Sequence, residues 1–336
     1  MALSKIPPAG HAQYVGARNL IINGAMQVDQ RNTTTTATGY ALDRYYCAKE
    51  NFDELVIAIT QDTDSPDDFS NSLKLAVTTA ESSLASDEIM YISQKIEAQN
   101  LQHLNFGSSA AKSITLSFFV KSSLTGKYSA LMYADDAVRS NLQSYTINSA
   151  NTWEKKTITF DGDTAGSGIN NDNGTGLWLF LSLAAGSDYH GTPHTGWGAY
   201  SQTDDFAHSD AVNFAAQTGE FFITGIQLEV GDTATDFEHR SFGDELARCQ
   251  RYYLSTVASH QMYQADGGNI PNGALCSFPC EMRAAPSVSF PSVMNATRTN
   301  SSSAVYVTSS SFYFGVNVTS TGTHNRQVTV AADAEL

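Results

Sequence analysis

Short segments in which apolar and polar residues alternate constrain the fold of this chain more than any other feature. In Ser113–Lys121, the side chains of Ile114, Leu116, Phe118 and Val120 point to one face of an extended segment. Such segments recur about every 15–25 residues with turn residues between them, and helical periodicity is nearly absent before residue 241. This pattern predicts an all-β protein with a jelly-roll β-sandwich rather than a parallel sheet with crossover helices.

The predicted sandwich begins at Asn19–Val28 and ends with the strand Phe221–Val230. Its other predicted strands are Tyr40–Cys47, Leu55–Thr60, Leu73–Thr78, Ile89–Glu97, Ser113–Lys121, Tyr128–Tyr133, Ser144–Ile147, Glu154–Phe160 and Leu177–Leu183. After residue 258, Gly- and Pro-containing turns separate five further short strands, which predicts a small second β-domain. These strands are expected at Ala274–Phe278, Ser287–Phe290, Ala304–Thr308, Ser311–Thr319 and Arg326–Ala331.

The periodicity changes once, in the stretch Gly225–Tyr253. Its strand ends at Gly231-Asp232, and from Ser241 the apolar residues follow the spacing of one helix face, with Ser241 as the expected N-cap. The face consists of Phe242, Leu246, Cys249 and Tyr253. We therefore predict an N-terminal arm at 1–17, the sandwich at 18–240, a linking amphipathic helix at 241–258 and the small β-domain at 259–336.

This stretch, GIQLEVGDTATDFEHRSFGDELARCQRYY, resembles a junction in tail-fibre and minor structural proteins of tailed bacteriophages. There a carbohydrate-binding-module-like β-sandwich ends in a QLE-x-G strand, followed by an ATxFExR link and an ELxxCQRYY helix. Asn19–Tyr46 is similar to the opening of the same sandwich, and Ala332–Leu336 to the usual end of the chain. The resemblance frames nearly all of residues 18–336.

The resemblance implies a virion protein, assembled in the host cytoplasm and exposed on the tail or capsid surface. Its implied role is that of a tail fibre or receptor-binding appendage that attaches to a host surface glycan without catalysis. It further implies a homotrimer whose N-terminal arm contacts other virion proteins. Asp43-Arg44 resembles a structural motif of the family, and we expect Arg44 to bridge strands with an acidic partner such as Glu229.

Composition and charge exclude several other classes. The net charge is −15, and a polyanion repels phosphate backbones, so a nucleic-acid partner is not expected. Met1–Gly10 has no apolar signal region, and no apolar run approaches the roughly 18 residues of a membrane span, so no membrane insertion is expected. The four cysteines are too few and too scattered for a disulfide framework.

The long segment Gly186–Asp210 is the predicted glycan-binding region. Segments of this length without regular structure are uncommon unless they are functional, and this one is rich in aromatic and histidine residues. Rings of this kind stack on sugars. The candidate residues are Tyr189, His190, His194, Trp197 and Tyr200. Two alternatives remain: these rings pack locally, or they pack against a neighbouring subunit.

A second loop offers carboxylates to a cation. Asp62, Asp64, Asp67 and Asp68 lie within seven residues and are candidate ligands for a structural Ca²⁺. No other cofactor is expected, and the sequence contains none of the common hydrolase, zinc-protease or phosphate-loop motifs. An architectural virion protein without a ligand is the alternative function, and a glycan-cleaving tail spike is a further one.

Overall fold

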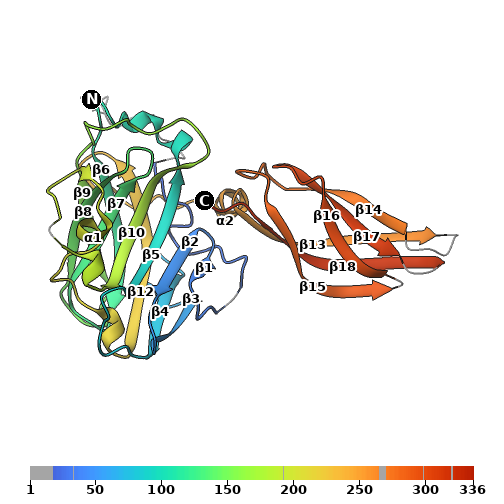
Figure 1. Cartoon of the computed structure of the whole chain (residues 1–336), viewed down its shortest axis with the longest axis horizontal. Coiled ribbons are helices and arrows are strands. Elements are labelled where there is room, and N and C mark those ends of the chain that lie inside the picture. Colours follow the sequence, from blue (N-terminus) through green and yellow to red (C-terminus); the bar gives the residue numbers. More distant parts are fainter. Residues whose placement is uncertain (1–17, 33, 192, 265–269, 298, 319–320) are drawn as a thin grey trace, which may run out of the picture.

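The computed structural model describes residues 18–32, 34–191, 193–264, 270–297, 299–318 and 321–336. The predicted arm at 1–17 lies outside these residues. Figure 1 shows two β-rich bodies placed end to end, with one short helix, α2 (Phe242–Gln250), between them. The strands dominate both bodies and pair antiparallel, which confirms the predicted all-β class. None of the helices within the described residues is long and apolar enough to cross a membrane.

The first body is a sandwich of two antiparallel sheets. The strands of the seven-stranded sheet, in spatial order, are β1 (Gly39–Leu42), β2 (Tyr45–Glu50), β5 (Ile89–Glu97), β10 (Thr175–Ala185), β7 (Gly126–Ala134), β8 (Arg139–Ile147) and β11 (Gly198–Ala199). Those of the five-stranded sheet are β3 (Val56–Asp62), β4 (Ser72–Thr79), β12 (Gly219–Val230), β6 (Ile114–Ser122) and β9 (Glu154–Phe160). The short helical segments are η2 (Ala98–Asn100), η3 (Gln102–Leu104), η4 (Ser187–Tyr189), α1 (Gln202–Asp205) and η5 (Phe214–Ala216).

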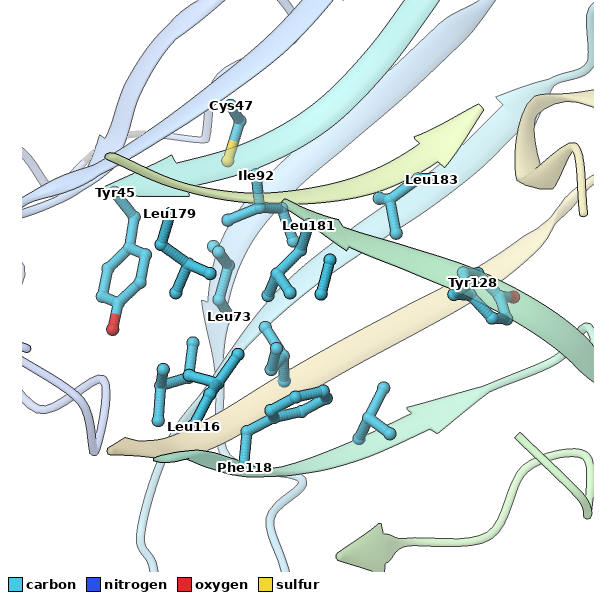
Figure 2. Packing of buried hydrophobic residues seen from close by; sticks show 14 of the residues in the cluster. Tyr45, Cys47, Leu73, Ile92, Leu116, Phe118, Tyr128, Leu179, Leu181 and Leu183 are labelled. Atoms are coloured by element: carbon cyan, nitrogen blue, oxygen red, sulfur yellow. The ribbon is translucent and has the colours of Figure 1, made fainter. Parts of the chain in front are cut away.

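The core of the sandwich lies between these two sheets. Leu179 and Leu181 of β10 point toward Leu116 and Phe118 of β6, and all four side chains are buried (Figure 2). Each fully buried side chain of this size contributes about 1.5–3 kcal/mol to folding. Residues 19–28, where the sandwich was predicted to begin, form no strand. They run irregularly along the core and bury Ile21, Met26 and Val28.

The second body also consists of two antiparallel sheets. One contains β13 (Tyr253–Gln264), β18 (Gly322–Asp333) and β15 (Ser287–Thr297), and the other contains β14 (Ile270–Ser277), β17 (Ser311–Val318) and β16 (Thr299–Val305). Its smaller core includes Phe312, Phe314, Val328 and Val330.

The linking helix is shorter than predicted. Ser241 caps α2 as expected, since its Oγ accepts a hydrogen bond from the backbone amide of Asp244 at 3.2 Å. The helix ends at Gln250, however, and Tyr253 already pairs with Asp333 in the first register position of β13 and β18. The predicted helical extent 241–258 is therefore wrong beyond residue 250, because strand pairing with a distant segment competes with the local period.

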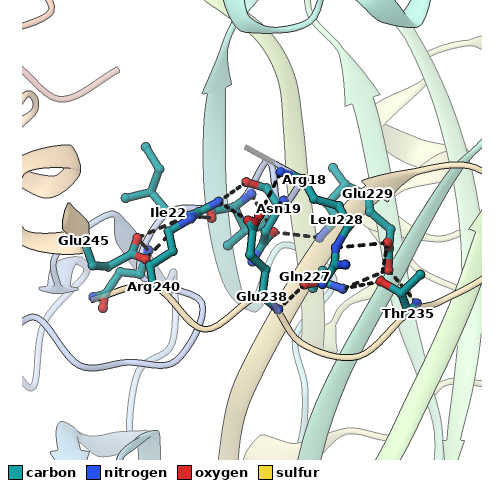
Figure 3. A network of polar contacts seen from close by, with 12 residues as sticks. Arg18, Asn19, Ile22, Gln227, Leu228, Glu229, Thr235, Glu238, Arg240 and Glu245 are labelled. Carbon is teal, nitrogen blue, oxygen red and sulfur yellow. Dashed lines mark hydrogen bonds and ion pairs between the residues drawn. The ribbon is translucent and has the colours of Figure 1, made fainter. Parts of the chain in front are cut away.

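A polar network joins the two ends of the sandwich sequence (Figure 3). Glu238 accepts hydrogen bonds from the backbone amides of Arg18 and Asn19, and the Asn19 side chain bonds the backbone of Ile226 and Leu228. This network includes many of the residues that carry the sequence resemblance. They are Gln227, Glu229, Thr235, Glu238, Arg240 and Glu245. Their role is to hold residues 18–23 against β12 and α2.

The pairing predicted between Arg44 and Glu229 is wrong. Glu229 instead accepts from Gln227 and from Thr235, with Arg18 at 3.6 Å. Arg44 lies in the turn between β1 and β2 and forms an ion pair with Glu335 from the end of the second body. It also donates to the Lys95 carbonyl at 2.6 Å, and its guanidinium carbon lies 3.4 Å from the ring centre of Tyr252.

Further contacts reinforce this junction between the two bodies. Arg31 lies 3.2 Å from the other oxygen of Glu335, and Arg251 of the linker donates two hydrogen bonds of 2.8 Å to Glu97 at the end of β5. The amide of Ala334 donates to the carbonyl of Tyr252 at 2.7 Å. The last residues described, 333–336, are thereby fixed against the sandwich.

Replacing Glu335 with glutamine will leave the buried Arg44 guanidinium without its anion. Removal of one partner of a buried ion pair costs about 3–5 kcal/mol, and both side chains here are at most 5% exposed. We expect Glu335→Gln to lower the free energy of unfolding of the full chain by about this amount in urea titrations at neutral pH. The control is Glu220→Gln, which breaks a more exposed pair with Lys74 and should cost less than about 1 kcal/mol. Equal losses in the two variants would contradict the assignment.

Candidate functional site

An aromatic groove lies on the outer face of the seven-stranded sheet, at the end formed by β1, β2, β5 and β10. It encloses about 230 Å³. Its lining residues are Tyr40, Arg44, Tyr46, Tyr91, Ser93, Lys95, Trp178 and Leu336. We call this set the aromatic groove. Because Leu336 belongs to the segment fixed by Arg44, both bodies of the chain contribute to its walls.

Strand register explains why these side chains gather. Tyr40 pairs with Tyr46, and Tyr46 pairs with Ser93, so the three lie in one row across the sheet. Lys95 pairs with Trp178 in the next row. Since alternate residues of a strand share a face, Ile92 and Leu179 point into the core, while Ser93 and Trp178 point outward.

The rings of the groove pack against neighbouring rings, Tyr40 and Tyr46 edge to face, and Tyr40, Tyr46 and Trp178 leave part of their surface open. Tyr40 and Tyr46 have ring centres 5.3 Å apart at 74°, and Trp178 packs against Phe180 at 4.2 Å. Tyr40, Tyr46 and Trp178 are half-buried, whereas Tyr91 is buried beneath them. Burial raises the pKa of Tyr46 and of Tyr91, and the Tyr91 hydroxyl donates to a Glu50 carboxylate oxygen at 3.5 Å.

Polar groups lie among these rings. The Lys95 ammonium lies 4.2 Å from the Trp178 ring centre and donates to the backbone oxygen of Leu336 at 3.1 Å. Burial lowers the pKa of Lys95, against the opposing effect of Asp135. The Ser93 hydroxyl and the Trp178 indole N–H have no hydrogen-bond partner among the described residues. Polar groups that are buried without a partner are costly, and a ligand hydroxyl can satisfy them.

The predicted glycan-binding segment covers the other end of the same sheet face. Its Phe206 is buried against Phe180 and Tyr91, and Tyr189 packs on Phe206. Tyr200 lies 4.8 Å from Tyr133, the cross-strand neighbour of Trp178. None of the five predicted residues lines the aromatic groove, so local packing is the alternative that the structure shows for these two tyrosines.

The remaining predicted residues of the segment also have local partners. The Trp197 ring packs edge-on against Phe106 at 5.3 Å, and its indole N–H donates to the carbonyl of Asp161. His194 lies 3.0 Å from an Asp205 oxygen through Nδ1 and 2.9 Å from the Ser140 carbonyl oxygen through Nε2. His190 pairs with Asp205 in an isolated bridge. With both ring nitrogens engaged, His194 fixes the segment and is not positioned as a general base.

The acidic loop does not gather its carboxylates around a common point. Asp64 pairs with Lys121 and accepts from the Trp153 indole, and Asp62 lies 3.4 Å from Lys74. Within the described residues no group of three or more His, Cys, Asp or Glu side chains is arranged to hold a metal ion. The prediction of Ca²⁺ ligands at Asp62, Asp64, Asp67 and Asp68 is therefore corrected: lysines and an indole occupy the oxygens of two of them.

A larger cleft of about 710 Å³ runs beside α2, but three of its charged groups, Glu238, Arg240 and Arg251, are already in ion pairs. Arg240 lies 2.9 Å from Glu238 and 3.4 Å from Glu245, and Arg251 is bound to Glu97. Size alone would favour this cleft. We assign the site to the aromatic groove because it combines open rings with polar groups that lack partners.

The class that the fold defines is an all-β protein with a jelly-roll-like sandwich of two antiparallel sheets. No family model and no curated protein matches the chain. Among solved structures, it is similar to a putative sugar binding protein from Bacteroides thetaiotaomicron, at 12% identity over 63% of this chain and 100% of that chain, with a TM-score of 0.37.

Two further solved structures are similar to this chain. The enzymatically active domain of tailspike protein 4 from bacteriophage CBA120 is 13% identical over 64% of this chain, with a TM-score of 0.35. The match spans only 22% of that tailspike chain. A family 11 carbohydrate-binding module of a Clostridium thermocellum cellulase is 10% identical over 60% of this chain and 99% of its own, with a TM-score of 0.31. These are likenesses of fold.

Sequence reasoning missed the aromatic groove, although part of the signal was present. In Ile89–Glu97 the outward positions are Tyr91, Ser93 and Lys95, and in Leu177–Leu183 they begin with Trp178 and Phe180. An outward face that carries aromatic rings is unusual for a solvated strand. This pattern could have marked each of the two strands as part of a binding site. It does not show that the two strands are neighbours in the sheet.

The predicted structural residue Asp43 provides a pH test of the junction. It is buried and accepts hydrogen bonds of 2.6 Å from the backbone and side-chain amides of Gln30, which also donates to the Tyr253 carbonyl. Burial raises the pKa of Asp43 from 3.8 to about 6, although the Gln30 hydrogen bonds and Arg31 oppose the shift. The protonated form is thus favoured by folding.

A raised pKa in the folded state means that the stabilisation is complete below the unfolded pKa and is lost as pH rises through the folded pKa. We expect the free energy of unfolding of the wild type, minus that of Asp43→Asn, to fall between about pH 4 and pH 6 and then to level off. Urea titrations across this range measure the difference. A difference that rises with pH would show that the ionised form of Asp43 is the one that the fold stabilises.

Proposed function

We propose that this protein binds a glycan in the aromatic groove, and that it does so as a non-catalytic receptor-binding appendage of a tailed-phage virion. The observation that carries the binding proposal is the combination of open rings of Trp178, Tyr46 and Tyr40 with the polar groups of Ser93 and Lys95 in one groove. Sugar rings present apolar C–H faces to aromatic rings and hydroxyls to polar groups, so they match both features.

The chemistry of the groove supports binding without cleavage. Glycoside hydrolysis generally uses two carboxyl groups about 5–9.5 Å apart. No Asp or Glu side chain is among the described residues that line the groove. Of the two acids adjacent in sequence to a groove residue, Glu335 is engaged by Arg44 and Arg31, and Asp43 accepts hydrogen bonds from Gln30. A tail-spike hydrolase is therefore the less favoured alternative.

The virion role rests on the sequence resemblance of Gly225–Tyr253 and its flanking motifs. In the structure these motif residues build a junction and not a binding site, so they also suit an architectural protein without a ligand. The aromatic groove is the feature that favours adhesion over that alternative. In a trimer, as the resemblance implies, linked weak sites would gain about 10²–10⁴ in overall affinity.

A glycan array of bacterial surface polysaccharides, followed by titration calorimetry with the strongest array ligand, tests the binding proposal. We expect the wild type to bind and Trp178→Ala to lose at least about tenfold in affinity, which corresponds to about 1.4 kcal/mol for one stacking ring. Trp197→Ala is the matched control, because Trp197 packs on Phe106 away from the groove. Thermal melts of both variants establish that they are folded.

Three results would count against this account. Absence of binding to every glycan would contradict the adhesive function, and loss of binding in Trp197→Ala alone would place the site in the 186–210 segment. Release of new reducing ends from the bound polysaccharide would show that the protein is an enzyme.

A further inference from the structure

Exposed apolar side chains are concentrated in the second body of the chain. Among the described residues, ten large apolar side chains are exposed, and seven of them belong to residues 253–336. These seven are Val257, Tyr263, Leu275, Val293, Met294, Val305 and Tyr306. A soluble surface usually scatters such residues, so their concentration in the smaller body marks an interaction surface.

Three of the apolar residues on this body form a continuous row. Leu275 of β14 pairs with Tyr313 of β17, and Tyr313 pairs with Val305 of β16, so the three lie side by side across the sheet. Phe312 and Phe314, on either side of Tyr313, point into the core, which places the row on the outer face. Tyr306 follows Val305 and is 85% exposed, and Leu275 is 69% exposed. We call these four residues the apolar row.

Small residues lie beside the apolar row. In the neighbouring register position Gly273 pairs with Gly315, and Gly315 pairs with Ser303, and the Tyr313 ring extends over Gly273. Neither edge strand of this sheet, Ile270–Ser277 or Thr299–Val305, contains a charged residue. Proteins commonly use charges to keep sheet edges from associating, and this sheet lacks that protection.

The distribution of charge indicates which partner fits. Residues 253–336 contain four acids (Asp266, Glu281, Asp333, Glu335) and three arginines (Arg283, Arg298, Arg326), a net charge of −1. The whole chain carries −15, so residues 1–252 carry −14. Two copies of the chain repel each other through their sandwiches but not through their second bodies. An interface core of this kind is depleted in charge and rich in tyrosine.

We propose that the apolar row is the surface through which a second copy of this chain docks. The apolar side chains of the row can be covered by the same side chains of a second copy. The uncharged face around the row does not complement a charged partner. The proposal is independent of the glycan site, because none of the four residues of the apolar row lines the aromatic groove.

Sedimentation velocity of the full chain over a range of micromolar concentrations tests this proposal. We expect the wild type to show a mass above the 36.2 kDa of one chain, and Leu275→Glu to return it to that value. Val56→Glu is the matched control, because Val56 is 44% exposed on the sandwich strand β3, and it should leave the assembly unchanged. Tyr306→Asn is a second variant that cannot disturb the core, and asparagine tolerates the positive φ of 52° at this position.

We expect Tyr306→Asn to weaken the association at least about tenfold, the effect of losing one exposed aromatic anchor. A wild type that stays monomeric at every concentration would overturn the proposal. So would an assembly that survives both Leu275→Glu and Tyr306→Asn, or one that Val56→Glu disrupts to the same extent.

Discussion

The buried ion pair between Arg44 and Glu335 is the contact on which the rest of the structure depends. A guanidinium that is 1% exposed needs an anion and hydrogen-bond acceptors close by. Arg44 finds them in a residue 291 positions away and in the backbone of the central strand β5. Because Glu335 follows β18 directly, this contact sets where the second body begins relative to the sandwich, and it places Leu336 at the wall of the aromatic groove.

The outer face of the seven-stranded sheet is divided between structure and proposed function. Residues 187–208 cover one end, where Phe206 and its neighbours form a second small core and His194 ties the segment to Asp205 and Ser140. The other end keeps its rings partly open between β2, β5 and β10. Because this segment shields one half of the sheet face, only the other half remains open, as a groove with defined walls. Ligand sites are commonly concave and mostly apolar, with a few polar groups that provide selectivity.

Local patterns in the sequence predicted much of the fold. Alternation located β9 with both of its ends, and the capping residue located the start of α2. The errors share one physical cause, which is pairing between distant segments. Tyr253 fits a helix face but pairs with Asp333, and nothing near Arg44 in the sequence indicates Glu335. The groove was missed for the same reason, since it requires the strand order that brings Tyr46, Ser93 and Trp178 together. For the long aromatic segment the sequence left local packing open as an alternative to glycan binding, and Phe206, Tyr189 and Tyr200 do pack on the sheet.

Hydrogen exchange of the full native chain is the most direct test of the junction. Slow exchange shared by two segments indicates that they open as one cooperative unit. The account predicts that the amide of Ala334, which donates to Tyr252, exchanges as slowly as the paired amides of β1 and β2 and responds to denaturant in the same way. Fast exchange at residues 331–336 alongside a protected sandwich would contradict it, because the end of the second body, with Leu336, would then open while the sandwich stays folded.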